Sequence, residues 1–477
     1  MSFEETLSYD DVLLLPSYSE VLPEHIDLGV QLFDGVRLNV PVLSAAMDTV
    51  TEQQMAIGLA LQGGVGVIHR NLTVEEQARQ VAAVKRYLNW IIAAPLTVTE
   101  DLTVREVWEE MQANEVSGMP VVRGKTLVGI ITSRDMRFCS DLSLKVRDVM
   151  TSELVVEVGR PDIASAQEKF NTYKIEKLPV VDEAGELTGL VTVKDMEKHR
   201  QFPRAAVDQH GRLLVGAAVA PSGLAERMDA LAEAQVDFVV MDAAHGDSKN
   251  VLDGVRYIKR QYDLPVIGGN IATAEGAEHL IDAGADAIKV GVGPGSICTT
   301  RVVAGIGVAQ FSAVRNAASV AAQRGVPVIA DGGIKYSGDV AKALAAGAHA
   351  VMIGNLFAGL RESPGREIIF EGRIFKTYRG MGSLGAIKQG SGDRYQMAQG
   401  EEPVPEGIEG RVPYKGELAP FLHQLVVGVK KGMGYCGCAT LAELRSYEKF
   451  VRVTSAGLKE GHVHDVAITQ EPPNYSR

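Results

Sequence analysis

The stretch Ala287-Ile-Lys-Val-Gly-Val-Gly-Pro-Gly-Ser-Ile-Cys-Thr-Thr-Arg301 joins a short β-branched run to a glycine-rich loop and a cysteine. Its first four residues predict a buried strand. Glycines at alternate positions, Gly291, Gly293 and Gly295, let the backbone turn tightly and bring its own N–H and C=O groups against a ligand or ion. The cysteine that follows, Cys298, is a candidate nucleophile if its thiolate form is favoured. The alternative is an ordinary packed thiol in a βα turn.

The composition limits the classes of protein to consider. The chain has 477 residues, 46% of them hydrophobic and 23% charged, which is typical of a soluble globular enzyme with more than one domain. The formal net charge of −12 argues against a nucleic-acid-binding protein, which needs a basic surface. An anionic ligand would therefore be held locally, by backbone N–H groups or a few placed cations.

The cysteines and the hydropathy pattern indicate the compartment. Four cysteines are too few for a disulfide framework in a chain of this length. The pair Cys436-Gly-Cys438 has no second pair to complete a metal site, so a structural role is favoured. The acidic first residues lack the apolar core of a signal peptide, and no run of 18 apolar residues predicts a membrane span. We expect a cytoplasmic protein that needs neither a membrane nor a nucleic acid.

Short apolar runs alternate with amphipathic stretches along most of the chain. The runs that predict strands end near Met47, His69, Ala220, His245, Asn270, Gly293, Gly333 and Asn355. Segments of helical periodicity lie at 51–62, 74–86, 224–234, 251–260, 274–283, 308–323 and 337–346. This pattern predicts an α/β fold with eight parallel βα units, the number that closes a TIM (β/α)8 barrel. A doubly wound sheet is the competing arrangement, although no first-turn glycine fingerprint supports it.

An internal repeat with a period of about 60 residues interrupts this pattern. Ser117-Gly-Met-Pro120-Val-Val recurs as Lys177-Leu-Pro179-Val-Val, and Gly129-Ile-Ile-Thr132-Ser-Arg-Asp135 recurs as Gly189-Leu-Val-Thr192-Val-Lys-Asp195. We therefore expect a barrel in two parts, 1–90 and 201–477, with an inserted module at 91–200. Its two repeats would cover about 93–147 and 148–200.

Each repeat carries a Thr-x-x-Asp motif at a predicted strand-to-helix junction: Thr132 with Asp135, and Thr192 with Asp195. The carboxylate could hold a ribose while the helix N-terminus faces a phosphate. Alternatively, the threonines cap the helices and the aspartates favour the helix dipole. Two motifs in register, each after a Pro-Val-Val strand, resemble the paired cystathionine-β-synthase (CBS) repeats of a Bateman module. That resemblance implies a regulatory purine-nucleotide site.

Polar and glycine residues gather where the predicted barrel strands end, and a barrel places its active site at that face. Gly332, Gly333, Gly354 and Asn355 follow the last two strands, where barrels commonly hold a phosphate on backbone N–H groups. Asp331 ends the strand beside them and could accept hydrogen bonds from ribose hydroxyls. Together these residues suggest a nucleoside monophosphate as ligand.

Several motifs resemble those of the IMP dehydrogenase family, essentially from end to end of the chain. They are Leu7-Ser-Tyr-Asp-Asp-Val, Gly293-Pro-Gly-Ser-Ile-Cys-Thr-Thr-Arg, Ala330-Asp-Gly-Gly-Ile, Tyr378-Arg-Gly-Met-Gly-Ser383 and His464-Asp-Val. The resemblance implies that Cys298 attacks C2 of IMP, that hydride passes to NAD, and that water hydrolyses the resulting thioimidate to XMP. Covalent attachment would split one hard oxidation into two steps.

The polar stretch 385–415 is punctuated by glycine and proline, as expected of a mobile flap or of a surface loop. By the same resemblance, Arg394 beside Tyr395 activates the hydrolytic water and Thr300 positions it. Glu406 belongs to a second proton-relay route. An arginine base is unusual because its pKa lies far above neutrality.

The resemblance also implies ligand contacts, a cation and an assembly. IMP would be held by Ser296, Asp331, Gly332, Gly333, Gly354, Asn355, Tyr378, Gly380, Met381, Gly382 and Glu406. NAD would face Asp242, Asn270, Gly291 and Gly293. Potassium (K+) would bind carbonyls of Gly293, Gly295 and Cys298, with Glu460, Gly461 and His462 supplied by a neighbouring subunit. A homotetramer follows, and pairing of tetramers into octamers stays open.

Three rival functions and a few departures from the family pattern bear on this interpretation. GMP reductase, the nearest rival, shares the barrel, the cysteine and the threonine, but normally lacks both the Arg-Tyr pair and the repeats. A regulator that senses nucleotides without activity would be expected to have lost Cys298 or Arg394, and a flavin-binding barrel would not explain the loop cysteine. Asn355 stands where the family usually has serine, and Gln396-Met397 stands where an aromatic is usual.

Overall fold

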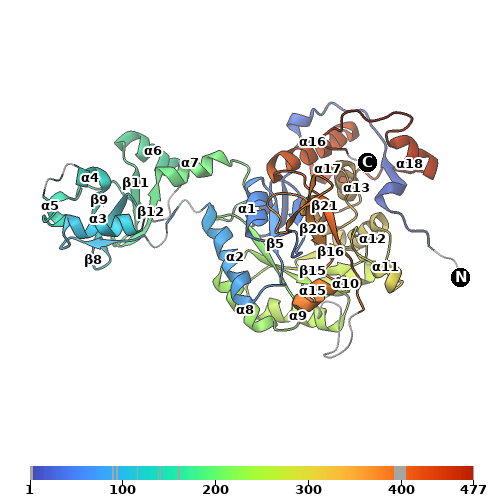
Figure 1. The fold of residues 1–477 in the computed structure, drawn as a ribbon, viewed down its shortest axis with the longest axis horizontal. Coiled ribbons are helices and arrows are strands. Elements are labelled where there is room, and N and C mark those ends of the chain that lie inside the picture. Colours follow the sequence, from blue (N-terminus) through green and yellow to red (C-terminus); the bar gives the residue numbers. More distant parts are fainter. Residues whose placement is uncertain are drawn as a thin grey trace. The chain divides into compact units, whose positions relative to one another are not determined.

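The computed structural model describes residues 4–88, 91–92, 95–114, 116–137, 139, 141–159, 162–391 and 404–475. The chain forms two compact units, one made of Met1–Tyr87 with Arg204–Arg477 and the other of Leu88–Pro203 (Figure 1). The second unit is about three residues wider at each end than the predicted insertion. Within the described ranges, none of the helices combines the length and hydropathy needed to span a bilayer.

The larger unit is built around a closed eight-stranded barrel, which confirms the predicted TIM-barrel class and excludes the doubly wound sheet. All neighbouring strands in it are parallel. Nearly every residue of these strands is buried, because side chains fill the interior and helices cover the outside. The strands are β4 (Val42–Ser44), β5 (Val65–Ile68), β13 (Val215–Val219), β14 (Phe238–Asp242), β15 (Val266–Ile271), β16 (Ala287–Val290), β17 (Val328–Asp331) and β18 (Ala350–Ile353).

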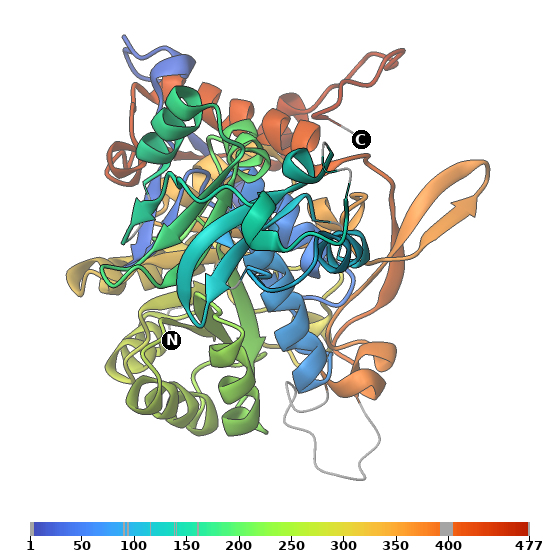
Figure 2. The same cartoon turned by 90° about the vertical axis from the view of Figure 1, so that its left-hand side faces the viewer.

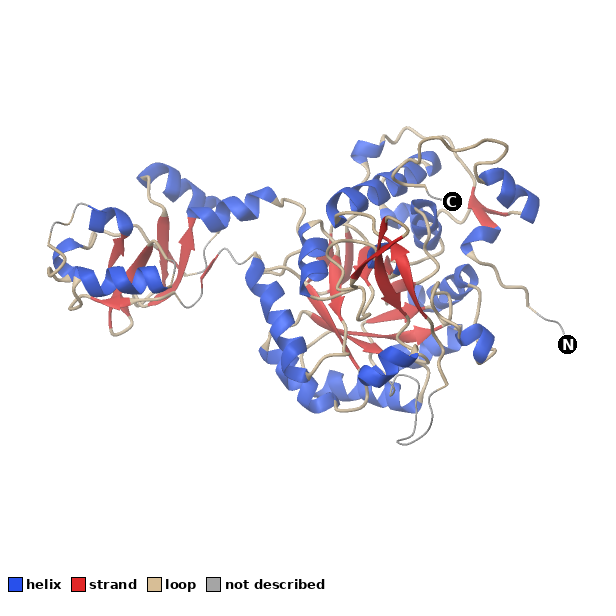
Figure 3. Ribbon diagram, viewed as in Figure 1, coloured by secondary structure: helices blue, strands red, loops and turns tan. Residues whose placement is uncertain are grey.

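A ring of helices surrounds the strands (Figure 3). Seven agree with the predicted segments to within two residues at each end: α1 (Gln53–Leu61), α2 (Val74–Tyr87), α8 (Leu224–Glu233), α9 (Lys249–Gln261), α10 (Ala274–Asp282), α12 (Gln310–Gln323) and α13 (Ser337–Ala345). The eighth strand is followed directly by only one turn, α14 (Asn355–Ala358). A later helix that we did not predict, α16 (Leu418–Cys436), packs against α1 and α13 and completes the cover.

Smaller elements decorate the barrel unit. The N-terminal strand β1 (Val12–Leu14) pairs with β22 (Phe450–Arg452), and β2 (Val30–Phe33) forms a hairpin with β3 (Val36–Leu38). The remaining short elements are η1 (Tyr9–Asp11), η2 (Pro23–His25), α11 (Thr300–Val303), α15 (Leu384–Ala386), η3 (Ile387–Ser391), α17 (Leu441–Arg445) and α18 (Ser455–Gly461).

A buried ion cluster lies at the amino end of the barrel strands. Lys85, near the end of α2, is 4% exposed. Its Nζ donates to Asp208 Oδ2 at 2.9 Å and to Asp237 Oδ1 at 2.8 Å, and Asp237 directly precedes β14. Asp208 also pairs with Arg212 Nη2 at 2.8 Å, so removing the lysine would leave chiefly the buried Asp237 carboxylate uncompensated. The cluster therefore ties α2 to the chain that returns after the inserted unit.

His349 makes the stability of the barrel unit sensitive to acid. Its Nδ1 accepts a hydrogen bond from Val328 N at 3.2 Å, and burial lowers the pKa of the ring to about 4, helped by the nearby charge of Arg445. An unfolded histidine binds its proton near pH 6.5, so acidification between pH 6.5 and 4 favours the unfolded chain.

We therefore expect the wild type to lose about 2 kcal/mol more unfolding free energy between pH 7 and pH 5 than His349→Asn, whose carbonyl keeps an acceptor in place. Urea unfolding of both proteins at the two pH values measures this difference. Equal losses would show that His349 is already protonated in the folded state at pH 5.

A three-stranded antiparallel sheet follows the barrel and contributes to the active-site face. It consists of β19 (Glu367–Phe370), β20 (Arg373–Arg379) and β21 (Glu409–Pro413), with Tyr378 paired to Gly410. The β19–β20 hairpin, light orange in Figure 2, extends away from the barrel. Part of the predicted flap 385–415 is thus regular structure, because β21 adds to β20. Residues 392–403, which include Arg394 and Tyr395, lie outside the described residues.

The second unit shows the same order of elements twice. The first half contains β7 (Val98–Thr99), α3 (Val104–Ala113), β8 (Gly118–Arg123), β9 (Thr126–Thr132) and α4 (Ser133–Arg137), followed by α5 (Val146–Val149). The second contains β10 (Glu157–Val158), α6 (Ile163–Tyr173), β11 (Lys177–Val181), β12 (Leu187–Thr192) and α7 (Val193–Gln201), and β6 (Ile91–Ile92) adds to its sheet. In each half a parallel strand pair is followed by an antiparallel one.

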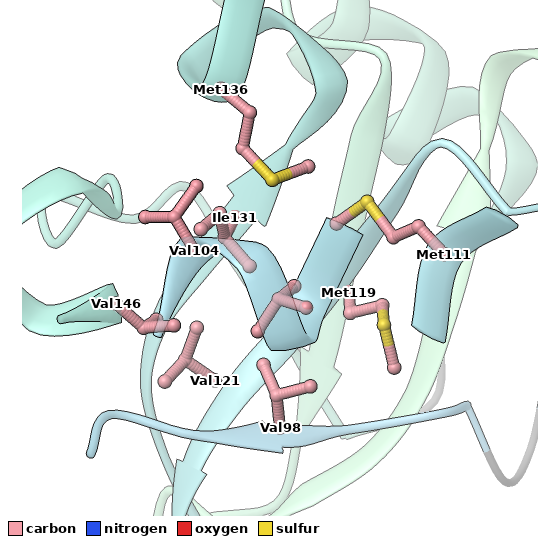
Figure 4. Close-up of a cluster of buried hydrophobic side chains, with 9 residues drawn as sticks. Val98, Val104, Met111, Met119, Val121, Ile131, Met136 and Val146 are labelled. Carbon is pink, nitrogen blue, oxygen red and sulfur yellow. The ribbon is translucent and has the colours of Figure 1, made fainter. Parts of the chain in front are cut away.

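Each half has its own apolar core. In the first, Val104 and Met111 from α3 pack against Met119 and Val121 from β8 and Ile131 from β9 (Figure 4). The second core is built from Ala166, Phe170, Leu178, Val180, Val191 and Met196. Burial of one face of α3 and α6 against these strands accounts for the repeated apolar pattern in the sequence.

Candidate active site

A cavity at the carboxyl ends of the barrel strands brings together most of the predicted catalytic and NAD-facing residues. We call it the cysteine cavity, because Cys298 lines it. Its other lining residues include Met47, Asp242, Asn270, Lys289, Gly291, Gly293, Gly295, Thr300, Asp331, Tyr378, Gly380, Met381, Gly382 and Glu406. They come from strand ends and loops up to hundreds of residues apart in sequence, as expected at this face of a barrel.

Cys298 begins a short chain of polar side chains. Its Sγ lies 3.1 Å from Thr300 Oγ1, and the Thr300 hydroxyl donates to Glu406 Oε2 at 2.7 Å. Since a hydroxyl has only one proton to donate, Thr300 gives it to the carboxylate and offers the sulfur its lone pairs. A proton released at the sulfur or at a neighbouring water thus has a hydrogen-bonded route to a carboxylate.

Backbone hydrogen bonds fix Glu406 beside the cysteine loop. Thr299 N donates to Glu406 O at 2.9 Å, and Glu406 N donates to Gly382 O at 3.0 Å. Cys298 and Gly407 form an isolated antiparallel bridge. The far end of the predicted flap therefore lies between the loop that carries Cys298 and the loop that follows β20.

A buried lysine for which the sequence predicted no role connects three of the predicted ligand-binding residues. Lys289 in β16 is 2% exposed, and its Nζ donates to Asp242 Oδ1 at 3.1 Å and to Asp331 Oδ2 at 2.9 Å. A third hydrogen bond goes to Asn270 Oδ1. The signal in the sequence was a single charged residue within a strand that is otherwise wholly apolar and is buried on both faces.

Asp331 and Asn270 are oriented by this cluster. Asn270 Nδ2 donates to Asp331 Oδ2 at 2.8 Å and to Gly291 O at 2.9 Å, so both ends of the amide have partners. In the described part of the chain, Asp331 Oδ1 has no hydrogen-bond partner, and Asp331 lines both this cavity and its neighbour. One carboxylate oxygen is thus held while the other stays available to a ligand.

A second cavity, which we call the Asn355 cavity, adjoins the first and shares Met47, Gly295, Asp331, Gly332 and Tyr378 with it. Ser296, Gly333, Gly354 and Asn355 line it together with Ser8, Tyr9, Asp10, Lys335 and Tyr336. The Asn355 amide donates to Ser296 Oγ at 2.5 Å. The predicted phosphate residues therefore lie together.

The backbone donors of this cavity differ in availability. Among the described residues, the N–H groups of Gly333, Gly354 and Asn355 have no acceptor. The N–H of Gly332 instead donates, at 3.5 Å, to Met352 O. Three free donors suit the oxygens of an anion. Tyr378, from β20, is buried at the same place, and burial raises the pKa of its hydroxyl, which keeps it a neutral donor.

A family model described as "IMP dehydrogenase / GMP reductase domain" matches residues 6–464. The chain belongs to this family. Among its relatives, the inosine-5'-monophosphate dehydrogenase of Halalkalibacterium halodurans is 54% identical, with 99% of this chain and 98% of the relative covered. The protein of the same name from Bacillus subtilis is 52% identical over the same shares of both chains.

A solved member of the family is a GMP reductase. The crystal structure of a cysteine-to-alanine variant of the Trypanosoma brucei enzyme, in complex with guanosine 5'-monophosphate, matches with a TM-score of 0.84 and 40% identity, covering 98% of this chain and 99% of that one. A reductase can therefore match this chain over nearly its whole length, inserted unit included. The repeats do not separate the two activities, contrary to our expectation. The identity to the dehydrogenases, at 52–54%, is higher than the 40% identity to the reductase, and it favours the dehydrogenase activity.

Within the family fold, the glycine loop presents carbonyl groups that suit a monovalent cation. In the part of the chain that is described, the carbonyls of Gly293 and Cys298 accept no hydrogen bond, and that of Gly295 accepts one from Cys298 N at 3.1 Å. Such oxygens are hard ligands. Glu460, Gly461 and His462 line neither cavity; His462 Nδ1 instead lies 3.1 Å from the Tyr475 hydroxyl.

The Thr-x-x-Asp motif of the first repeat caps its own helix. Thr132 N and Oγ1 donate to Asp135 Oδ2 at 2.8 and 2.6 Å. This geometry agrees with the capping interpretation and leaves Asp135 Oδ1 for another group. Thr192 occupies the corresponding position at the end of β12, and the side chain of Asp195 lies outside the described residues.

Gly291 is required by close packing against Asp331. A Cβ at position 291 would lie 2.1 Å from Asp331 O, and Gly291 O also accepts from Asn270. Gly291→Ala would therefore displace the strand end that carries the Asp331 carboxylate. We expect kcat/KM for the nucleotide to fall by about 100-fold, since a 1 Å misplacement has effects of that size.

Steady-state kinetics with Gly338→Ala as control measures this effect, because an added Cβ at position 338 meets no atom within 4 Å. Unchanged kinetics in Gly291→Ala would mean that the loop relaxes without moving Asp331.

Proposed function

We propose that this protein oxidises IMP to XMP, with NAD as hydride acceptor and water as second substrate, through a covalent intermediate on Cys298. The observation that carries the proposal is the line of contacts from Cys298 through Thr300 to Glu406, in a cavity that also holds the Asp242, Asn270 and Asp331 cluster. The same reaction is supported by the family to which the chain belongs and by its 54% sequence identity to a dehydrogenase.

The reaction has two steps that balance. The Cys298 sulfur forms a bond to C2 of IMP, the hydride at C2 leaves to NAD, and a thioimidate and NADH result. Water then adds to C2, the C2–S bond breaks, and XMP and the free thiol are released with one net proton. A sulfur nucleophile suits both steps, because it attacks readily and leaves readily.

The two cavities divide the nucleotide between them. Asp331 Oδ1 would accept from the ribose hydroxyls, and the free N–H groups of Gly333, Gly354 and Asn355 would bind the phosphate. Ser296 and Tyr378 would add hydroxyl donors, with Gly380, Met381 and Gly382 beside the base. NAD would then face Asp242 and Asn270, next to the glycine loop.

For the hydrolytic step we propose two routes for the proton. Arg394, with Tyr395 beside it, would activate the water that Thr300 positions, which requires an environment that disfavours the charge of the guanidinium. The second route is the described contact from Thr300 to Glu406. Because neither partner of that contact lies within 392–403, it would support slow hydrolysis when Arg394 is replaced.

We also propose a regulatory role for the inserted unit and a cation site at the glycine loop. Leu88–Pro203 would be a Bateman module that binds regulatory purine nucleotides near the two Thr-x-x-Asp motifs, supported by the repeated order of elements. Carbonyls of Gly293, Gly295 and Cys298 would hold potassium, with Glu460, Gly461 and His462 of a neighbouring subunit in a homotetramer.

The decisive test is NADH absorbance after mixing the purified protein with IMP, NAD and a potassium salt. NADH formation with one XMP per NADH supports the proposal. No NADH, together with NADPH oxidation on addition of GMP, would assign the chain to the reductase activity instead. No activity in either assay, together with binding of purine nucleotides, would indicate a nucleotide sensor without catalytic activity.

A further inference from the structure

Three lysines are buried among the described residues, and they differ in what surrounds them: Lys85, Lys289 and Lys376. Lys376 Nζ donates to backbone carbonyls, including Leu360 O at 2.9 Å and Ser363 O at 2.6 Å. Lys85 pairs with carboxylates at the amino end of the barrel. The partners of Lys289 are side chains that line the cysteine cavity.

The three donors of the Lys289 ammonium are all used, one on each of Asp242, Asn270 and Asp331. Because these partners end three neighbouring strands, one group joins the carboxyl ends of β14, β15 and β17 from its own position in β16. Asp242 and Asn270 belong to the NAD side of the proposed site, and Asp331 to the nucleotide side.

We propose that Lys289 is a positioning residue that couples the two substrate subsites, so that a change at one subsite alters the affinity of the other. The proposal rests on the proposed function, since that function assigns the two sides. Lys289 itself does not react; it sets where two carboxylates and one amide point.

The charges explain why a lysine is needed. Without the ammonium, Asp242 and Asp331 would lose the cation that they share, and two like charges would remain at the buried ends of nearby strands. Asn270 Oδ1 would also lose its donor, so the amide would be held from its Nδ2 end alone, by Asp331 Oδ2 and Gly291 O. Both subsites would then change geometry together.

Coupling of this kind must be reciprocal. In the protein with Lys289 intact, Asp242→Asn weakens the pull on the ammonium from the NAD side and lets it shift toward Asp331. We therefore expect Asp242→Asn to change the Kd of IMP, measured by titration calorimetry without NAD, by about 3- to 10-fold. Likewise, Asp331→Asn should change the KM of NAD by a similar factor.

Lys289→Met removes the connection. We expect it to raise the Kd of IMP and the KM of NAD by about 10- to 100-fold each, as for the loss of charge-assisted hydrogen bonds. In that background, adding Asp242→Asn should leave the Kd of IMP unchanged. Lys289→Arg keeps the charge and should recover part of both affinities.

Lys85→Met is the matched control, because Asp237 at the start of β14 corresponds to Asp242 at its end. It should lower the unfolding temperature as much as Lys289→Met while leaving Kd and KM unchanged. Equal losses of affinity in both variants would reduce Lys289 to a stabilising residue and overturn the proposal.

The outcomes separate this inference from the proposed function. If the wild type makes no NADH from IMP, the proposed function fails, while the Kd of IMP can still be compared among the variants. If the wild type turns over and Asp242→Asn does not alter the Kd of IMP, the coupling fails alone. This second test uses proteins that retain Lys289, so it holds even where Lys289→Met does not fold.

Discussion

Cys298→Ala will form no NADH from IMP and NAD, with turnover lowered by at least about 10⁴-fold. The reason is that no other group in the cysteine cavity, as far as the chain is described, can take the place of the sulfur: the Thr300 hydroxyl, which donates to Glu406, is intrinsically a much weaker nucleophile than a thiol. IMP should still bind, since the groups proposed to hold it lie on Asp331 and on backbone N–H groups of the Asn355 cavity. Stopped-flow absorbance at saturating substrates measures the first property and calorimetry the second.

Cys139→Ala is the control, because Cys139 is another free, partly exposed cysteine and lies in the inserted unit. It should keep full activity. A Cys298→Ala protein that still releases NADH at the first turnover would show that hydride leaves without covalent attachment. The proposal of a thioimidate would then be wrong.

Arg394→Ala should separate the two chemical steps. Hydride transfer precedes the use of water, so a single-turnover burst of NADH near one equivalent per active site should survive. Steady turnover should fall by about 10²- to 10⁴-fold, the range for loss of a general base. The burst amplitude and the slow phase are both read from one stopped-flow trace at high enzyme concentration.

Two further variants sharpen the test. Arg411→Ala removes an arginine from the same predicted flap range, at a position in β21 where the guanidinium lies over Phe370, and it should not change either phase. Adding Glu406→Gln to Arg394→Ala should remove the residual slow phase, because the amide oxygen can still accept from Thr300 but cannot take up a proton. Full steady turnover in Arg394→Ala would show that a group other than Arg394 activates the water.

Local patterns were enough to predict the barrel. Strands such as β14 and β15 are buried at every position because both of their faces are covered, and such short runs between helical segments leave little choice of architecture. In the inserted unit, helix α3 likewise follows from local sequence, since Thr103 caps its start and apolar residues recur on one face. The repeated unit was visible for the same reason, as its motifs recur at a fixed interval.

Helix α16 and strand β21 were not predicted. The first covers α1 and α13, and the second adds to β20 across the predicted flap, so each is placed by a partner far away in the sequence. The composition of 385–415, rich in polar residues, glycine and proline, predicts one flexible segment. Pairing with an existing strand edge supplies hydrogen bonds that a composition-based prediction cannot include.

The sequence by itself determined the fold class and the loop that presents Cys298, because each depends on residues close together in the chain. Only the tertiary structure decided that Thr300 meets Glu406, 106 positions away, and that Lys289 joins Asp242, Asn270 and Asp331. A lysine in a buried strand signals that it needs partners, since an unpaired buried charge is too costly. Which partners it finds depends on the closure of the barrel, which brings separate strand ends within hydrogen-bonding distance.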